Sequence, residues 1–173
     1  MPNATLKADI DLWDGKSKNA ITRVYKKHNG KANFLVDVIA LIADEPMQVG
    51  ATWLLKHYFD EGGPPLESPS AAAVYSKVDS LVHWEAKLHV LQCMEHLPIS
   101  KDQVKPVEKL LRLCLAGEAK FVRAWAYSGF HELARQHPEF QPEASRILAV
   151  ALETETAGSV LARVRRKIQQ GFS

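Results

Sequence analysis

The pentapeptide Val122-Arg123-Ala124-Trp125-Ala126 is followed, 38 positions later, by Val160-Leu161-Ala162-Arg163-Val164, which has a similar apolar pattern. A fixed period of about 20–50 residues is typical of solenoids, in which each unit buries its apolar face against a neighbour. Related apolar helices, spaced by 36, 36 and 38 residues, are predicted to start near Met47, His83, Ala119 and Ala157. The repeat therefore predicts a stack of helical hairpins.

Apolar periodicity, interrupted by Pro and Gly residues, predicts nine or ten helices. Short connections between them favour antiparallel neighbours. The segment 1–15 is acidic and has no sustained period, so we expect an N-terminal arm before one helical-repeat domain, 16–173. The stretch 60–69, with two Gly and three Pro, is the one predicted long loop. The helices are expected at about 17–28, 34–42, 47–60, 71–81, 83–97, 101–116, 119–137, 141–155 and 157–170.

Val122-Arg123, followed by Ala126, resembles the Val-Arg-x-x-Ala pattern that often opens the second helix of HEAT repeats. The layout of residues 32–170 is similar to that of the HEAT-repeat (armadillo-type) family. This resemblance implies an all-α fold, namely a right-handed α-α superhelix of about four HEAT-like hairpins with an N-terminal helical cap. Trp84-Glu85-Ala86-Lys87 occupies the corresponding place in the 70–97 unit, which leaves the register of that unit open.

Composition and charge argue against a membrane-spanning, secreted or disulfide-rich protein. The net charge of +2 is too small to indicate a nucleic-acid or membrane partner by itself, and the basic excess lies in residues 100–173. No apolar run approaches the roughly 20 residues of a membrane-spanning helix, and we expect no secretory signal. Cys93 and Cys114 are too few for a disulfide framework and predict buried thiols in a reducing compartment. We therefore expect a cytoplasmic protein with no membrane partner.

One set of residues has metal-ligand chemistry. His89, Cys93 and His96 lie at positions i, i+4 and i+7 of one predicted helix, so they share a face that could hold zinc with a fourth ligand. In the favoured interpretation Cys93 packs in the core and the histidines border an apolar stripe, since no second ligand pair is present. No nucleophile, phosphate-binding or cofactor motif occurs. The sequence thus predicts no enzyme, cofactor or metal.

A solenoid presents an extended concave surface, and the resemblance implies that the second helices of the hairpins form it. We expect a non-enzymatic scaffold that binds a protein or peptide partner there, with the oligomeric state left open. The residues predicted to contact the partner are Lys87, Arg123, Tyr127, Arg163 and Arg166.

Nucleic-acid binding is the alternative function. Arg163, Arg165, Arg166 and Lys167 form a basic run in the last helix, to which Arg123 and Trp125 could contribute. Some HEAT-like proteins, including alkylpurine DNA glycosylases, hold a duplex backbone with such residues. Two of the three tryptophans Trp53, Trp84 and Trp125 are expected to be mainly structural, and Trp13 is expected to be exposed or docked on the body.

Overall fold

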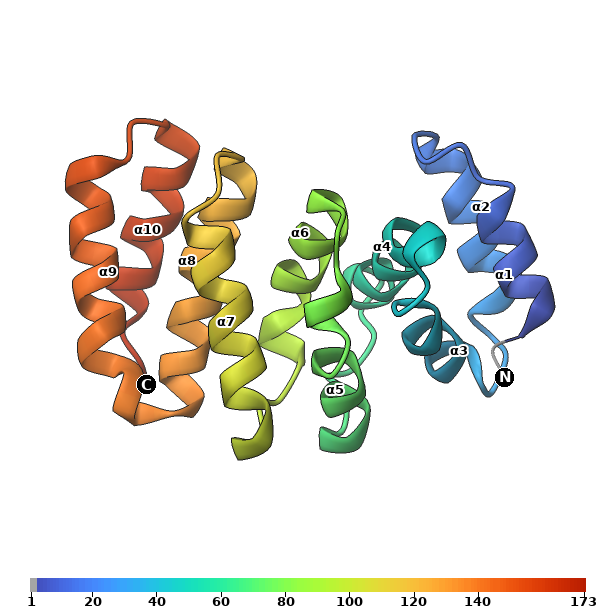
Figure 1. Ribbon diagram of the computed structural model, residues 1–173, viewed down its shortest axis with the longest axis horizontal. Helices are drawn as coiled ribbons and strands as arrows, with labels where there is room; N and C mark the ends of the chain where they lie inside the picture. Colours follow the sequence, from blue (N-terminus) through green and yellow to red (C-terminus); the bar gives the residue numbers. More distant parts are fainter. Residues whose placement is uncertain (1–2) are drawn as a thin grey trace.

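The computed structural model describes residues 3–173; residues 1–2, part of the predicted arm, lie outside the described residues. Residues 3–173 form ten α-helices and no strand, which confirms the all-α prediction (Figure 1). The α-helices are α1 (Ala4–Asp11), α2 (Lys18–His28), α3 (Phe34–Leu41), α4 (Gln48–Asp60), α5 (Ser68–Tyr75), α6 (Trp84–Cys93), α7 (Val104–Leu115), α8 (Lys120–Gln136), α9 (Gln141–Thr154) and α10 (Gly158–Gln170). Five short 3-10 helices lie between them: η1 (Glu45–Met47), η2 (Val78–Ser80), η3 (Met94–His96), η4 (Lys101–Gln103) and η5 (Pro138–Phe140).

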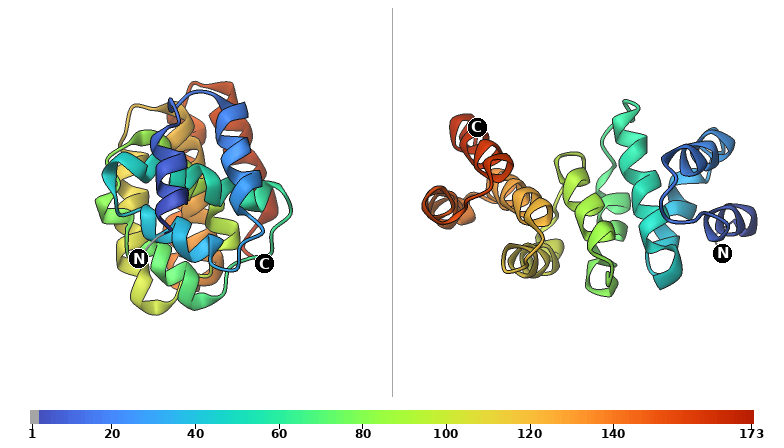
Figure 2. Two further views of the ribbon diagram at one scale, coloured as in Figure 1. Left: turned by 90° about the vertical axis from the view of Figure 1, so that its right-hand side faces the viewer. Right: turned by 90° about the horizontal axis from the view of Figure 1, so that it is seen from above.

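The helices form two layers. The even-numbered helices α2, α4, α6, α8 and α10 contact one another in that order, and we call them the even layer. The odd-numbered helices form the second layer. The chain therefore alternates between the two layers as it advances along the molecule (Figures 1 and 2). The two termini consequently lie toward opposite ends of the long axis.

Side-chain hydrogen bonds join parts of the stack that are 32 to 37 positions apart in the sequence. The Gln48 side chain donates from Nε2 to the Ser80 carbonyl at 2.7 Å and accepts from the Val82 backbone N–H at 3.0 Å, over 32 and 34 positions. The Ile99 backbone N–H donates to Oε1 of Gln136 at 2.7 Å, over 37 positions. These bonds connect α4 to the segment before α6, and α8 to the segment before α7.

The segment predicted to be an arm is packed into the fold. Helix α1 buries Leu6 and Ile10, and Oδ2 of Asp9 lies 2.6 Å from Nε2 of His28 in α2. A Cβ atom added to Gly50 of α4 would lie 2.5 Å from Cγ2 of Ile10, so α1 approaches α4 closely. An eight-residue helix with two buried positions is too short to show a period in the sequence, and the prediction missed it for that reason.

The predicted loop 60–69 is shorter than expected and is anchored. Helix α5 begins at Ser68, and Pro69 stands in its first turn, where a missing N–H breaks no intrahelical bond. Leu66 is buried, and its backbone N–H donates to the carbonyl of His96 at 3.0 Å. Helices α5 and α6 also end earlier than predicted, because the chain continues as the 3-10 helices η2 and η3.

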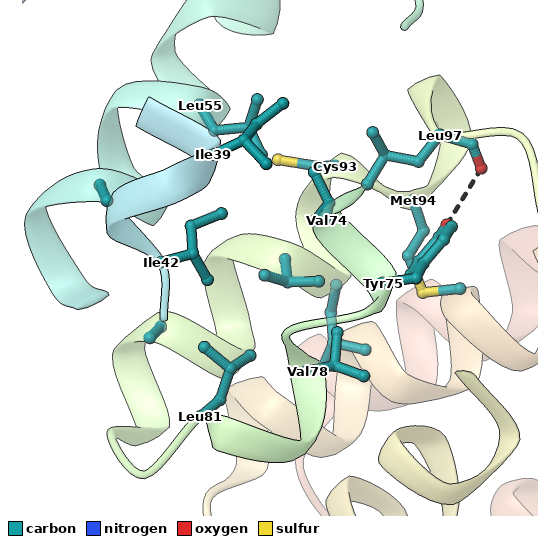
Figure 3. Packing of buried hydrophobic residues seen from close by; sticks show 14 of the residues in the cluster. Ile39, Ile42, Leu55, Val74, Tyr75, Val78, Leu81, Cys93, Met94 and Leu97 are labelled. Atoms are coloured by element: carbon teal, nitrogen blue, oxygen red, sulfur yellow. Dashed lines mark hydrogen bonds between the residues drawn. The ribbon is translucent and has the colours of Figure 1, made fainter. Parts of the chain in front are cut away.

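The main core cluster extends from α1 to the start of α9, and a smaller one lies between α8, α9 and α10. Tyr75 is fully buried, and its hydroxyl donates to the carbonyl of Leu97 at 3.0 Å, which satisfies a polar group that water cannot reach (Figure 3). Cys93 packs in the same region, where burial raises the pKa of its thiol. Within residues 3–173 no helix is long and apolar enough to cross a bilayer.

Candidate functional site

Arg163 of α10 stacks on Trp125 of α8. The Cζ atom of the guanidinium lies 3.5 Å from the centre of the indole ring, and Nη1 lies 3.4 Å from the hydroxyl of Ser128. Both Arg163 and Trp125 are half-buried. A cation over an indole face is attracted by the ring quadrupole, so this contact fixes the Arg163 side chain between the two helices.

Three cations of α10 gather beside this stack. Arg163, Arg166 and Lys167 are spaced i, i+3 and i+4 and share one face of the helix, whereas Arg165 points away from it. None of the three forms a salt bridge with any residue of the described range 3–173. Burial lowers the pKa of Arg163, and repulsion by Arg166 lowers it further. We call these three residues the cation cluster.

The cation cluster lies beside a cleft between α6, α8 and α10, which Lys167 lines directly and Arg163 approaches through its stack on Trp125. A small cavity of about 20 Å³ beneath Trp125 is lined by Gln92 and Glu95 of α6 and η3, by Glu132 of α8 and by Lys167. A second cavity of about 580 Å³ shares Glu95, Glu132 and Lys167 with it, so the two are adjacent. We call the two cavities together the α6–α8–α10 cleft. Its further lining residues are His96, His131, Arg135, Gln170, Gly171 and Ser173.

The two carboxylates of the cleft, Glu132 and Glu95, differ in their hydrogen bonds and exposure. The Glu132 carboxylate accepts hydrogen bonds from Arg135 at 2.6 and 2.9 Å and from Gln136 at 2.7 Å, so it is neutralised within α8. Glu95 is exposed on the α6 side. Burial lowers the pKa values of Arg163 and Lys167, and the nearby charge of Glu95 raises them in part. The cleft thus has a positive wall on α10 and a carboxylate on the opposite wall.

Polar atoms without partners also border the cleft. Oε1 of Gln92 is buried and accepts no hydrogen bond, although a buried carbonyl oxygen normally has a donor. His131 is buried as well, and its Nδ1 has no partner, while its Nε2 lies 2.6 Å from the carbonyl oxygen of Gly171. The His131 ring stacks on Phe172 at 5.1 Å between centroids, so the C-terminal residues close one end of the cleft.

Two of the predicted partner-binding residues lie elsewhere. Arg123 donates from Nε and Nη2 to the Glu155 carboxylate at 2.8 and 3.0 Å, and the hydroxyl of Tyr127 donates to the same carboxylate at 2.8 Å. These residues are four apart on one side of α8, and Trp125 between them points to the other side. Tyr127 also borders a cavity with residues of α7 and α9. The structure therefore places Arg123 and Tyr127 toward the odd-numbered helices, where they connect α8 to the α9–α10 turn.

Lys87 is also outside the cleft. It lies near Cys114 of α7, where burial raises the pKa of the thiol to about 11 and the charge of Lys87 partly opposes that rise. Of the five predicted residues, the structure brings together Arg163 and Arg166. The structure places Trp125, which the nucleic-acid alternative also named, beside Arg163. Gln92 and Glu95, which no sequence pattern indicated, enter the site because α6 and η3 pack against α8.

The three residues considered for zinc are each engaged in packing. Nδ1 of His89 lies 3.0 Å from Oγ1 of Thr52, and burial lowers the pKa of His89 to about 4. Cys93 is buried, and the ring of His96 stacks on Phe59 with 4.5 Å between centroids. The described part of the chain contains no group of three or more His, Cys, Asp or Glu side chains arranged to hold a metal ion.

The remaining tryptophans have separate surroundings. Trp53 stacks on His57 of its own helix with 4.6 Å between centroids. Trp13 docks on the body, because its indole N–H donates to the carbonyl of Ser17 at 2.9 Å. Trp84 is 51% exposed at the start of α6, which makes it the most exposed tryptophan among the described residues.

A second depression, of about 490 Å³, lies between α7 and α9 on the other side of the molecule. Its walls are largely apolar and include Leu115, Ile147 and Val150. At its rim Arg112 pairs with Glu143 at 2.9 Å, so the charges there neutralise each other. The α6–α8–α10 cleft is the stronger candidate site because the cation cluster beside it has no such partners.

Comparisons with models of known protein families, with curated proteins and with solved structures found no match.

Proposed function

We propose that the protein is a non-enzymatic helical-repeat scaffold that holds a protein or peptide partner on its concave face. In this proposal the chain is a right-handed, HEAT-like α-α superhelix and the even layer forms the concave face. The alternation of the two layers, the bend of the stack seen from above (Figure 2) and the hydrogen bonds over about one repeat support it. We also propose a cytoplasmic location, supported by the two free, buried cysteines.

The α6–α8–α10 cleft is the observation that carries this proposal. Tryptophan and arginine are enriched among the residues that dominate protein–protein binding energies. Trp125 and Arg163 form a pre-stacked pair at the surface of the even layer, so little side-chain freedom remains to be lost when a partner binds. The wide part of the cleft, about 580 Å³, is of the size that receives a few side chains.

The cation cluster gives the nucleic-acid alternative a specific basis, because affinity for a phosphate backbone comes from clustered positive charge. The carboxylate of Glu95 weighs against it, since it faces the cluster across the cleft and would repel a second phosphate there. The mixed charge therefore favours a protein or peptide as the partner.

A peptide selection tests the proposal. A library of random 12-residue peptides displayed on phage is selected on the immobilised wild-type protein, with the Trp125→Ala variant present in solution as a competitor that removes peptides bound outside the cleft. We expect peptides whose amide chemical-shift changes map to α6, α8 and α10 in NMR spectra. Failure to recover any such peptide would contradict the proposal. Tight binding of a 20-base-pair DNA duplex, lost in Arg166→Glu and falling steeply with salt, would support the nucleic-acid function instead.

A further inference from the structure

The cation cluster differs from Arg112, Arg123 and Arg135 in how its charge is compensated. Arg112 and Arg123 each contact a carboxylate within 3.0 Å, and Arg135 donates to Glu132 at 2.6 Å. Arg163 and Lys167 are also half-buried but have no carboxylate partner among residues 3–173. Taking a cation partly out of water without a carboxylate in direct contact is costly, so a carboxylate supplied from outside would be bound favourably.

The spacing of the cluster limits how much negative charge it can receive. Arg163, Arg166 and Lys167 occupy about one turn of α10, so they suit one or two neighbouring carboxylates rather than a long anionic chain. Across the cleft Glu95 opposes further negative charge. The preferred ligand is therefore acidic at one end and uncharged or basic where it passes α6.

Two further features of the cleft suit a peptide backbone. Gln92 lines the cavity beneath Trp125, and its buried Oε1 has no hydrogen-bond donor, so a ligand N–H that reached it would satisfy this acceptor. The Trp125 ring and the Arg163 guanidinium together offer a flat surface beside it. A peptide has N–H donors next to its side-chain carboxylates, whereas a phosphodiester linkage contains no donor.

We infer that the partner presents an acidic peptide segment, with a Glu or Asp side chain held by Arg163, Arg166 and Lys167 and a backbone N–H directed at Gln92. The inference rests on the proposed function and specifies the partner chemistry of the same cleft. Arg166 is exposed and supports no packing, so its replacement tests recognition rather than folding.

The test uses three fluorescein-labelled 12-residue peptides that differ only at four positions, which are all Glu, all Gln or all Lys. Fluorescence anisotropy with the full chain should give the Glu peptide at least about tenfold tighter binding than the Gln peptide, because charged pairs dominate specificity at such sites. Arg166→Glu should remove this preference. Arg165→Glu makes the same change in net charge on the same helix but on another face. The ratio of the Glu-peptide and Gln-peptide affinities in this variant should stay within twofold of the wild-type ratio. Thermal melts of both variants check that they are folded.

The possible failures are distinguishable. If the phage selection yields peptides that bind the cleft but are not enriched in Asp or Glu, the acidic specificity is wrong and the scaffold function stands. If the selection yields no cleft-binding peptide, and the Glu and Gln peptides do not bind either, both the scaffold function and the acidic specificity are wrong. Equal losses in Arg165→Glu and Arg166→Glu would show attraction to net charge rather than a site, and would overturn the inference.

Discussion

The guanidinium of Arg163 lies 3.5 Å from the centre of the Trp125 ring, although the two residues are 38 positions apart. That separation equals the offset between the two similar pentapeptides of the sequence, and the contact joins two successive helices of the even layer. The sequence predicted a partner-binding role for Arg163, and Trp125 was one of three tryptophans of which two were expected to be mainly structural. In the structure each supports the other: the ring positions the guanidinium, and the guanidinium covers one face of the ring.

Arg163→Ala should lower the free energy of unfolding by about 1 kcal/mol, the range of a partly desolvated cation–π contact. Urea denaturation followed by circular dichroism measures the change. In a Trp125→Leu background the same substitution should cost much less, because the ring that attracts the cation is gone. Arg165→Ala is the matched control on the same helix and should change stability by less than about 0.5 kcal/mol. Equal costs of Arg163→Ala in both backgrounds would show that the contact contributes nothing.

Glu155 joins Arg123 and Tyr127, so Glu155→Gln should destabilise the protein by about 2 kcal/mol, as expected for hydrogen bonds to a charged group. The hydrogen bond from Arg123 lowers the pKa of Glu155 below the usual 4.5. The folded state then binds fewer protons than the unfolded state, so this stability is present above pH 4.5 and is lost as pH falls through the folded-state pKa.

Urea denaturation at pH 7 and at pH 3 tests this linkage. The gap in stability between wild type and Glu155→Gln should be largest at pH 7 and should narrow in acid. Glu153→Gln, at an exposed position near the end of α9, serves as the control and should follow the wild type at both pH values. A gap that stays constant from pH 7 to pH 3 would contradict the assignment of Glu155 as a charged, bonded partner.

The positions of most helices could be predicted because they depend on local signals. Pro46, Pro138 and Gly117 interrupt apolar periods near the helix ends in the structure. Helix α1 could not be predicted, since its two buried residues become meaningful only when α2 and α4 cover them. Its place in the fold depends on contacts that are distant in sequence, and these leave no periodic trace.

The site was predictable only where one helix determines the geometry. The spacing of Arg163 and Arg166 puts them on one face whatever surrounds α10. The direction of Arg123 was not predictable, because the Val-Arg-x-x-Ala pattern does not say which side of α8 meets the next unit. Its partner Glu155 is 32 positions away. Gln92 and Glu95 enter the cleft through the packing of α6 on α8, which a single sequence does not specify.

The close approach of α1 to α4 predicts the effect of adding one methyl group. Gly50→Ala places a Cβ atom 2.5 Å from Cγ2 of Ile10, so the helices must move apart, at a cost of about 2 kcal/mol. In an Ile10→Ala background the obstructing methyl group is absent, and Gly50→Ala should cost at least about 1 kcal/mol less. Gly30→Ala meets no atom within 4 Å and should be nearly neutral. Additive effects of the Gly50 and Ile10 substitutions in urea denaturation would show that α1 does not pack as described.

His89 predicts how stability responds to mild acid. Burial, and secondarily the charge of Lys56, lower the pKa of His89 from 6.5 to about 4 in the folded protein. Below pH 6.5 the unfolded chain therefore binds a proton that the folded chain does not, and stability falls as pH decreases from 6.5 toward 4. A difference of this size corresponds to about 3 kcal/mol by pH 4. His89→Gln, whose amide can still bond to Thr52, should flatten the fall in the urea midpoint between pH 7 and pH 4. If the urea midpoint of His89→Gln falls between pH 7 and pH 4 as steeply as that of the wild type, other groups cause the acid sensitivity. A shallower fall would show that the imidazole between α4 and α6 is neutral in the folded protein.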